Sequence, residues 1–202
     1  AMQQQDLLAY QRQMSILAYL DPGLYGETRV PFELVKAQIG IVYQGGYYLF
    51  PACEPNTTQP LNVLTVRTQI AAMMKTPVTA PAPLVSLVRV KRSAQAGLRD
   101  SLSPALSMGL KRLRFAPIII NSDTRAHPLP LSELRQAERG VGDHALTIFD
   151  TGRTFVFDQS HIFFDGNWGA ALAEIMTNEA LSWAGYLARL PAASHANERI
   201  FV

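Results

Sequence analysis

Near its start, the chain spaces apolar residues as a helix would. The pattern predicts an amphipathic helix over residues 5–20, with apolar positions at Leu7, Leu8, Ile16, Leu17 and Leu20. This helix is expected to stop where Asp, Pro and Gly follow one another at residues 21–23. Residues 21–31 are rich in Gly and Pro and are expected to form a loop.

Two later stretches predict β-hairpins. Residues 37–51 contain two runs of β-branched and aromatic residues on either side of Gly45 and Gly46. Residues 145–149 and 154–159 form a similar pair across an Asp-Thr-Gly turn. Both hairpins are expected to join a sheet, because an isolated hairpin is marginally stable in water.

Further strands and helices fill the rest of the pattern. Short apolar runs predict a buried strand over residues 84–90 and a central strand over residues 115–120. Helices are predicted over residues 61–74, 93–102, 103–112, 131–138 and 169–189. This alternation predicts an α/β or α+β fold, in which helices cover a mixed, mostly antiparallel sheet.

Composition and charge exclude several classes of protein. With 48% hydrophobic and 17% charged residues, a chain of 202 residues can bury a core and is not intrinsically disordered. The net charge of +2 gives no field that would attract nucleic acid. No apolar run is long enough to span a bilayer, and the first residues have no signal-peptide pattern.

Cysteine and metal-ligand patterns are equally restrictive. Cys53 is the one cysteine, which excludes an intramolecular disulfide and a cysteine-rich metal site. A lone cysteine suits a reducing compartment, so we expect a cytoplasmic protein. Asp158, His161 and Asp165 lack the spacing of a metal site, and no metal is expected.

The stretch that carries chemistry is TFVFDQSHIFFDGNWGAALA, residues 154–173. A predicted strand runs into His161, Asp165 follows four residues later, and Gly166 precedes a predicted helix. A histidine at a strand end can project its imidazole into a cleft and take a proton near neutral pH. Asp165 can hold the loop, and Gly166 permits a tight turn into the helix. The alternative is a loop histidine beside an aspartate that caps the helix.

The H-x-x-x-D-G pattern between a strand and a helix resembles the CoA-dependent acyltransferase superfamily, and longer similarity favours its choline/carnitine acyltransferase family. Residues 40–74 are similar to that family's hairpin, loop and helix. Ser86 and Arg89 match its "L-T-S-L-x-R-x-x-W-A" region, and Asp143 matches its "F-D-K-x-L-Q-x-I-V" region. The resemblance covers roughly residues 38–190 in the same order.

The resemblance implies acyl transfer between CoA and a hydroxyl acceptor of the carnitine or choline kind. His161 would be the general base, and Asp165 would orient its loop. Gly166 and Ser160 would be structural residues of the motif. The ligands would be coenzyme A, as acyl-CoA, and a small hydroxyl acceptor, without a metal. The fold would be one chloramphenicol-acetyltransferase-like half of a two-lobed enzyme.

The sequence also departs from the family's pattern. Ser160 stands where the family usually has glutamate, and the family's CoA-binding basic loop and Ser-Thr-Ser motif follow well after the histidine, where this sequence ends. We therefore expect a single acyltransferase-like domain that is part of a longer chain. Its divisions would be an N-terminal helix and loop, a core and a tail, at residues 1–36, 37–190 and 191–202.

Two other interpretations stay open on the sequence alone. One is a compact chloramphenicol-acetyltransferase-like enzyme with its site at a trimer interface. The other is a non-catalytic module of the same fold that serves in binding. The partner would be a second acyltransferase half or another copy of the chain. A basic run at Lys111, Arg112 and Arg114 fits either a helix carboxyl end or a contact with a CoA phosphate.

Overall fold

The computed structural model describes residues 16–23, 26–76, 90, 94, 97–98, 101–123, 128–134, 144–164 and 166–193. The strands in these ranges are β1 (Ala18–Gly23), β2 (Gly26–Pro31), β3 (Gln38–Tyr43), β4 (Gly46–Pro51), β5 (Ile118–Asn121), β6 (Leu146–Asp150) and β7 (Phe155–Gln159). The helices are η1 (Leu34–Lys36), α2 (Val63–Lys75), α5 (Pro104–Leu113), α6 (Leu131–Leu134) and α7 (Gly166–Leu187).

The main sheet is mixed and has the strand order β4-β3-β5-β6-β7, while β1 and β2 form a separate hairpin. β3 pairs with β5, and β5 with β6, in parallel, whereas β4 and β7 are antiparallel edge strands that complete the two hairpins. Among the described strands, three of the five pairings are antiparallel. The predicted α+β class, with a mixed sheet and covering helices, is confirmed.

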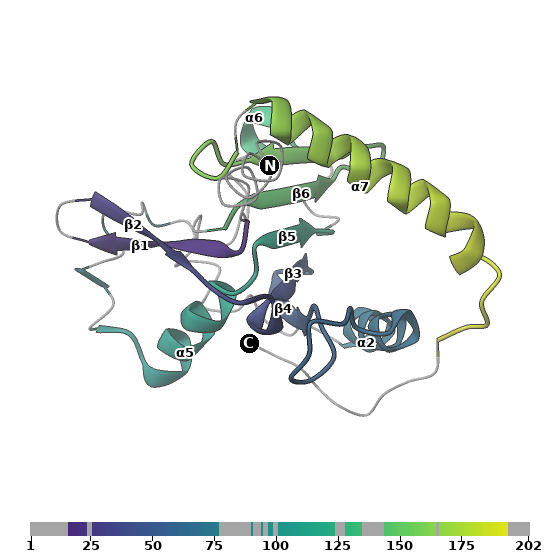
Figure 1. Ribbon diagram of the computed structural model, residues 1–202, viewed down its shortest axis with the longest axis horizontal. Coiled ribbons are helices and arrows are strands. Elements are labelled where there is room, and N and C mark those ends of the chain that lie inside the picture. Colours follow the sequence, from purple (N-terminus) through teal and green to yellow (C-terminus); the bar gives the residue numbers. More distant parts are fainter. Residues whose placement is uncertain are drawn as a thin grey trace, which may run out of the picture.

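Helices cover both faces of the main sheet (Figure 1). Paired residues on neighbouring strands project to the same face. One face carries the row Gly40, Ile119, Thr147 and Asp158. It packs against α5 through Leu113, so we call it the α5 face. The opposite face carries the row Ile41, Ile120, Ile148 and Phe157.

This opposite face, the α7 face, is covered by two helices. Met73 of α2 packs against Ile41 and Tyr48 at the β3–β4 side of the sheet. Trp168 and Leu172 of α7 pack in the cluster that contains Leu146 and Ile148 of β6. The sheet is therefore the middle layer of three, and α7 covers the strands that lead into the predicted motif.

The first predicted hairpin is confirmed, with its turn one residue earlier than the Gly-Gly pair. Gln44 and Gly45 have φ angles of 48° and 78°, which is the left-handed conformation that two-residue hairpin turns require. The buried Asp123 carboxylate, which follows β5, accepts a 2.8 Å hydrogen bond from the Gly45 amide. The turn is thus held by the neighbouring parallel strand as well as by its own sequence.

The predicted N-terminal helix is wrong where the structure describes it, because residues 18–23 form the strand β1. Ala18 and Leu20 are buried, with exposures of 1% and 2%, and Tyr19 between them contacts Phe32 and Phe115 on the other side. This alternation has the period of a strand. The predicted loop over residues 21–31 is also wrong, since β2 lies there. Residues 1–15 lie outside the described residues.

Several other predicted elements are confirmed. α2, α5, β5 and the β6–β7 hairpin lie where the sequence placed them, and the Ser103 hydroxyl caps α5 by accepting from the Leu106 amide at 3.4 Å. α7 begins at Gly166, three residues earlier than predicted. Most of the predicted strand at residues 84–90 and most of the predicted helix at residues 93–102 lie outside the described residues.

The basic run at the end of α5 has a structural partner. Arg114 forms an ion pair with Asp21 of β1 at 3.1 Å, and its guanidinium lies 5.2 Å from the centre of the Tyr19 ring. Lys111 and Arg112 lie in the last turn of α5, where the helix dipole stabilises cations. Arg114 therefore joins the end of α5 to the β1–β2 hairpin.

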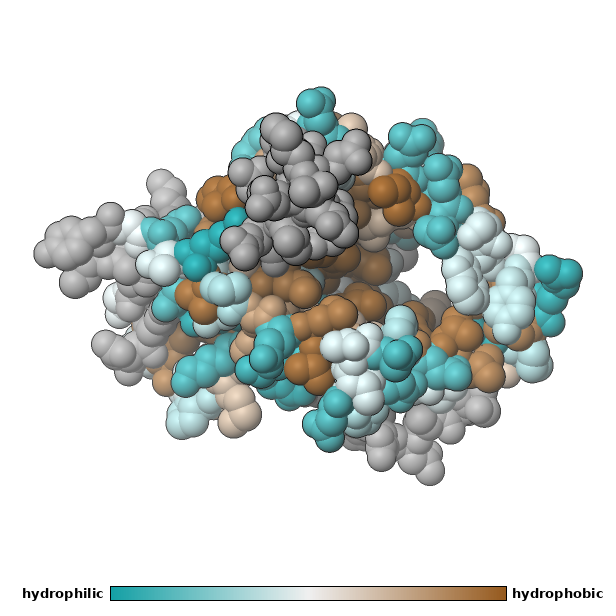
Figure 2. Space-filling model, in the orientation of Figure 1, coloured by the Kyte–Doolittle hydropathy of each residue, from teal (hydrophilic) through white to brown (hydrophobic). Residues whose placement is uncertain are grey.

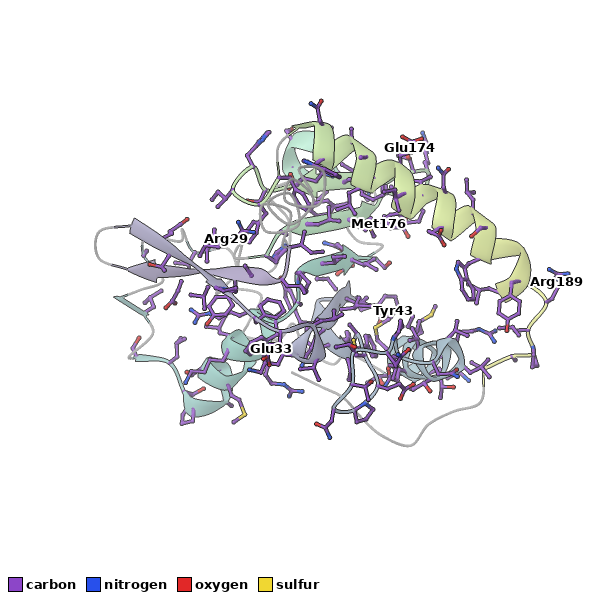
Figure 3. The ribbon with its side chains drawn as sticks, in the orientation of Figure 1. Arg29, Glu33, Tyr43, Glu174, Met176 and Arg189 are labelled. Carbon is purple, nitrogen blue, oxygen red and sulfur yellow. The ribbon has the colours of Figure 1, made fainter. Side chains whose placement is uncertain are left out.

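The second half of α7 extends beyond the sheet. Met176 points toward the sheet and Glu174 points away from it (Figure 3). Beyond these residues the helix exposes large apolar side chains, among them Leu181 and Trp183. Figure 2 shows an opening between this half of α7 and the rest of the molecule. The packing that fixes α7 on the sheet therefore lies in its first turns.

We predict that ionisation of Tyr48 lowers the free energy of unfolding at alkaline pH. Burial under α2, with a smaller contribution from Tyr43, raises the pKa of Tyr48 above its ordinary value of 10.0. The folded state therefore favours the un-ionised hydroxyl, and this stabilisation is fully present below pH 10 and is lost as the pH rises through the folded pKa. Urea unfolding should show a shallower alkaline decline for Tyr48→Phe than for the wild type. Parallel curves would contradict this account.

Candidate functional site

The predicted motif lies at the junction of β7 and α7. The Ser160 amide donates to the Ala145 carbonyl at 3.0 Å, and the Ser160 carbonyl accepts from the amides of Phe163 and Phe164 at 2.9 and 3.2 Å. The amides of Ala145 and Leu146 in turn both donate to the Pro117 carbonyl. These bonds join the segment after β7 to the segments that precede β6 and β5. Together they hold the turn that contains His161.

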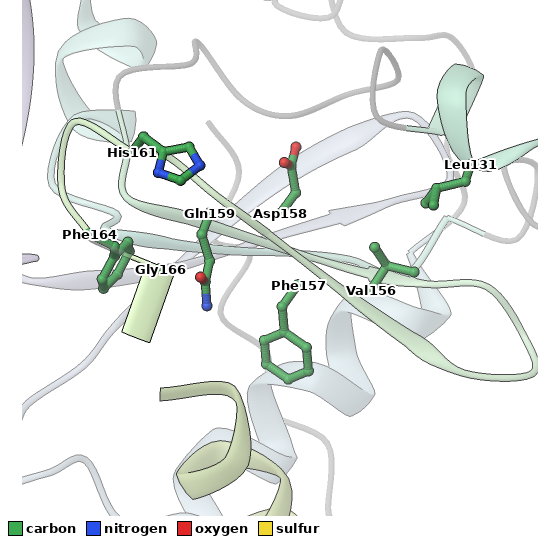
Figure 4. Close-up of a pocket in the computed structure, with 8 residues that line it drawn as sticks. All are labelled: Leu131, Val156, Phe157, Asp158, Gln159, His161, Phe164 and Gly166. Atoms are coloured by element: carbon green, nitrogen blue, oxygen red, sulfur yellow. The ribbon is translucent and has the colours of Figure 1, made fainter. Parts of the chain in front are cut away.

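His161 lies in this turn and is exposed. It borders a cavity of ≈ 330 Å³, a size typical of the smaller ligand sites in proteins. The lining residues come from α6, β7, the turn and the start of α7, and they are Leu131, Val156, Phe157, Asp158, Gln159, His161, Phe164 and Gly166 (Figure 4). The cavity therefore combines apolar walls with one imidazole and one carboxylate.

Asp158 supplies that carboxylate from within β7. Its side chain is on the α5 face, opposite Thr147 in the β6–β7 register, and only 6% of the residue is exposed. Thr147 is buried too, and its hydroxyl lies 2.7 Å from the Nε2 atom of the buried His144. The wall of the cavity beside His161 is thus backed by a buried polar group made of Asp158, Thr147 and His144.

Gln159, the next residue of β7, projects to the opposite face and holds α7. Its Nε2 atom donates a 2.6 Å hydrogen bond to the Gly169 carbonyl. Gly169 is buried, and a Cβ atom at this position would overlap the Gln159 side chain. This close approach explains a glycine in the first turns of the helix and sets the position of α7 relative to the turn.

The other motif residues have different outcomes. Asp165 lies outside the described residues, so its predicted role in orienting the loop stays a prediction. Gly166 starts α7 with a φ outside the left-handed region, and a Cβ there would meet no described atom within 4 Å. No left-handed φ calls for a glycine here, and the role of Gly166 in the turn stays a prediction because the turn includes residue 165. Gly166 also borders the cavity.

Aromatic residues of the turn belong to the core. Phe163 and Phe164 are 2% and 8% exposed and pack with Ala18 and Leu20 of β1. Arg29 of β2 lies over the Phe163 ring at 5.4 Å. The β1–β2 hairpin, which the sequence analysis did not predict, thus packs against the two phenylalanines of the turn. Phe164 also forms part of the cavity wall.

Sequence reasoning missed Asp158 as a site residue and considered it only as a poor metal ligand. The alternation of side chains along the predicted strand already separated Asp158 from Phe157 and Gln159. Its pairing with Thr147 is seen only in the structure. Its location depends on the pairing of β6 with β7 and on α6, which no short motif encodes. The described residues contain no cluster of His, Cys, Asp or Glu that could hold a metal ion.

No protein-family model matches the chain, and no curated protein matches it either. Among the helices that the structure describes, none has both the length and the apolar character to cross a bilayer. Because no family model and no curated protein match, the geometry of the β7–α7 junction is the basis for a proposed function.

We predict that Gly169→Ala loosens the attachment of α7. The added methyl group would displace the Gln159 amide and break its hydrogen bond, so the free energy of unfolding should fall by about 1–2 kcal/mol. In a Gln159→Ala background the same substitution should cost nothing, because the obstructing side chain is gone. Urea unfolding measures both effects.

Gly185→Ala is the matched control in the same helix. A Cβ at Gly185 meets no described atom within 4 Å, so the substitution should stabilise the protein by up to about 1 kcal/mol through helix propensity alone. Equal effects of Gly169→Ala and Gly185→Ala would contradict the close packing assigned to Gly169.

Proposed function

We propose that the chain carries the general base of a CoA-dependent acyltransferase, with His161 as that base. The observation that supports this best is the position of His161, in the turn between β7 and the long helix α7, at the border of a cavity with apolar walls. The resemblance to the choline/carnitine acyltransferase family rests on the same residues. An imidazole in this setting suits proton transfer near neutral pH.

The reaction then needs no covalent intermediate on the protein. The His161 imidazole takes the proton of the acceptor hydroxyl while the hydroxyl oxygen attacks the thioester carbonyl carbon of acyl-CoA. The carbon–sulfur bond of the resulting tetrahedral intermediate breaks, and the imidazolium returns its proton to the CoA thiolate. The products are an acyl ester and free CoA, and the histidine is regenerated.

The cavity fits the reacting ends of the two substrates rather than a whole CoA molecule. Its described lining includes no lysine or arginine that could pair with the CoA phosphates. The apolar side chains of Leu131, Val156 and Phe164 suit an acyl group or the carbon skeleton of an acceptor. In this proposal the nucleotide end of CoA lies beyond the cavity, on another surface of the assembly.

The exposure of His161 favours a site that a second body completes. Water reaches the imidazole, whereas acyl transfer to a hydroxyl competes with hydrolysis unless water is excluded. In our proposal a second acyltransferase half or another copy of the chain covers the open side of the cavity. The group that stabilises the oxyanion of the intermediate would come with it.

We predict that His161→Ala lowers kcat/KM for CoA release by about 10²–10⁴-fold, the usual contribution of a general base. The assay uses the full-length protein, with the second half or copy that completes the site, and follows free CoA from acetyl-CoA with a panel of small hydroxyl acceptors. Ile162→Ala is the matched control, because Ile162 is the next residue of the turn and its side chain is half exposed. Equal rates for the wild type and His161→Ala would overturn the assignment.

A further inference from the structure

We propose that Asp158 is the positioning residue of His161. Its carboxylate, rather than that of Asp165 alone, orients the imidazole and selects which ring nitrogen carries the proton. The importance of this arrangement for catalysis rests on the proposed acyl transfer. The arrangement itself rests on geometry and is tested separately below.

The side chains of Asp158 and His161 share one space. Asp158 and His161 border the same cavity. In Figure 4 both side chains rise on the same side of β7, and the imidazole ring extends toward the carboxylate, while Gln159 and Phe157 point to the other side. The alternation of the strand therefore places the Asp158 carboxylate, and no other described carboxylate, among the lining residues beside the histidine.

The Asp158 carboxylate is attached to a rigid part of the sheet. Asp158 lies within β7, paired to Thr147 of a central part of the sheet. His144, Thr147 and Asp158 are 7%, 2% and 6% exposed, so each side chain is fixed by its surroundings. The 2.7 Å contact between His144 Nε2 and Thr147 Oγ1 continues this polar group away from the cavity. A side chain held in this way can impose a geometry on a neighbour in a turn.

The chemistry of a carboxylate suits it to select the tautomer of a neighbouring imidazole. Burial of a carboxylate is unfavourable unless donors hold it, so the buried Asp158 carboxylate is held in place in the wall of the cavity. A carboxylate only accepts hydrogen bonds. It therefore favours the imidazole tautomer whose N–H faces it, which leaves the other ring nitrogen free to act as the base. The same carboxylate stabilises the imidazolium that forms when that base takes a proton.

The direct test is the tautomer of His161, read from ¹⁵N NMR shifts of the labelled full chain at about pH 8.5, where an ordinary histidine is neutral. We expect one dominant tautomer in the wild type and a changed tautomer ratio in Asp158→Asn. Asp150→Asn is the matched control, because Asp150 is in the same hairpin and its carboxylate accepts from the Gly152 amide in the turn far from the cavity. An unchanged ratio in Asp158→Asn would overturn the proposal.

If Asp158→Asn does not fold, Asp158→Thr replaces it, since threonine is compatible with a strand and lacks the carboxylate. A tautomer ratio that equals the wild-type ratio in this variant would also overturn the proposal.

Activity gives the second readout. We expect Asp158→Asn to lower kcat for CoA release by about 10²-fold with KM little changed, as for a misoriented base. A loss confined to KM would contradict the positioning role. Failure of the proposed function looks different: His161→Ala would then keep full activity while the tautomer still depends on Asp158.

Discussion

The hydrogen bond from the Gln159 side chain to the Gly169 carbonyl is the interaction on which the candidate site depends. It joins the last residue of β7 to the first turns of α7, at a distance that leaves no room for a Cβ at Gly169. The turn between them is closed at both ends, because Ser160 is bonded to the segment that precedes β6. His161 thus lies in a turn that is held by the Ser160 backbone bonds on one side and by the Gln159–Gly169 bond on the other.

One strand serves two purposes through its alternation. Gln159 faces α7 and fixes the helix, whereas Asp158 faces the other side and forms the cavity wall. A shift of the β6–β7 register by one residue would exchange these faces and remove both functions. The same pairing places Thr147 behind Asp158. Structural and chemical roles are therefore set by a single register, and for that reason the site and the fold cannot vary independently.

Much of the fold could be predicted from the sequence, because its signals are local. The turn near Gly45, the Ser103 cap and the Asp-Thr-Gly turn each mark an element within a few residues. The N-terminal prediction failed because Ile16, Leu17 and Leu20 also fit a helical spacing. The burial of Ala18 and Leu20 against Phe163 becomes visible only in three dimensions. His161 was found through its motif. Asp158 was missed as a site residue because its place in the cavity depends on strand pairing.

The central claim is that the His161 imidazole performs the proton transfer in acyl transfer. It is tested most directly by diethylpyrocarbonate modification of the wild-type chain, with the modified histidines mapped by mass spectrometry while CoA release is followed. The account predicts that activity falls in proportion to modification of His161 and that acetyl-CoA slows this modification. Full modification of His161 with undiminished CoA release would contradict it.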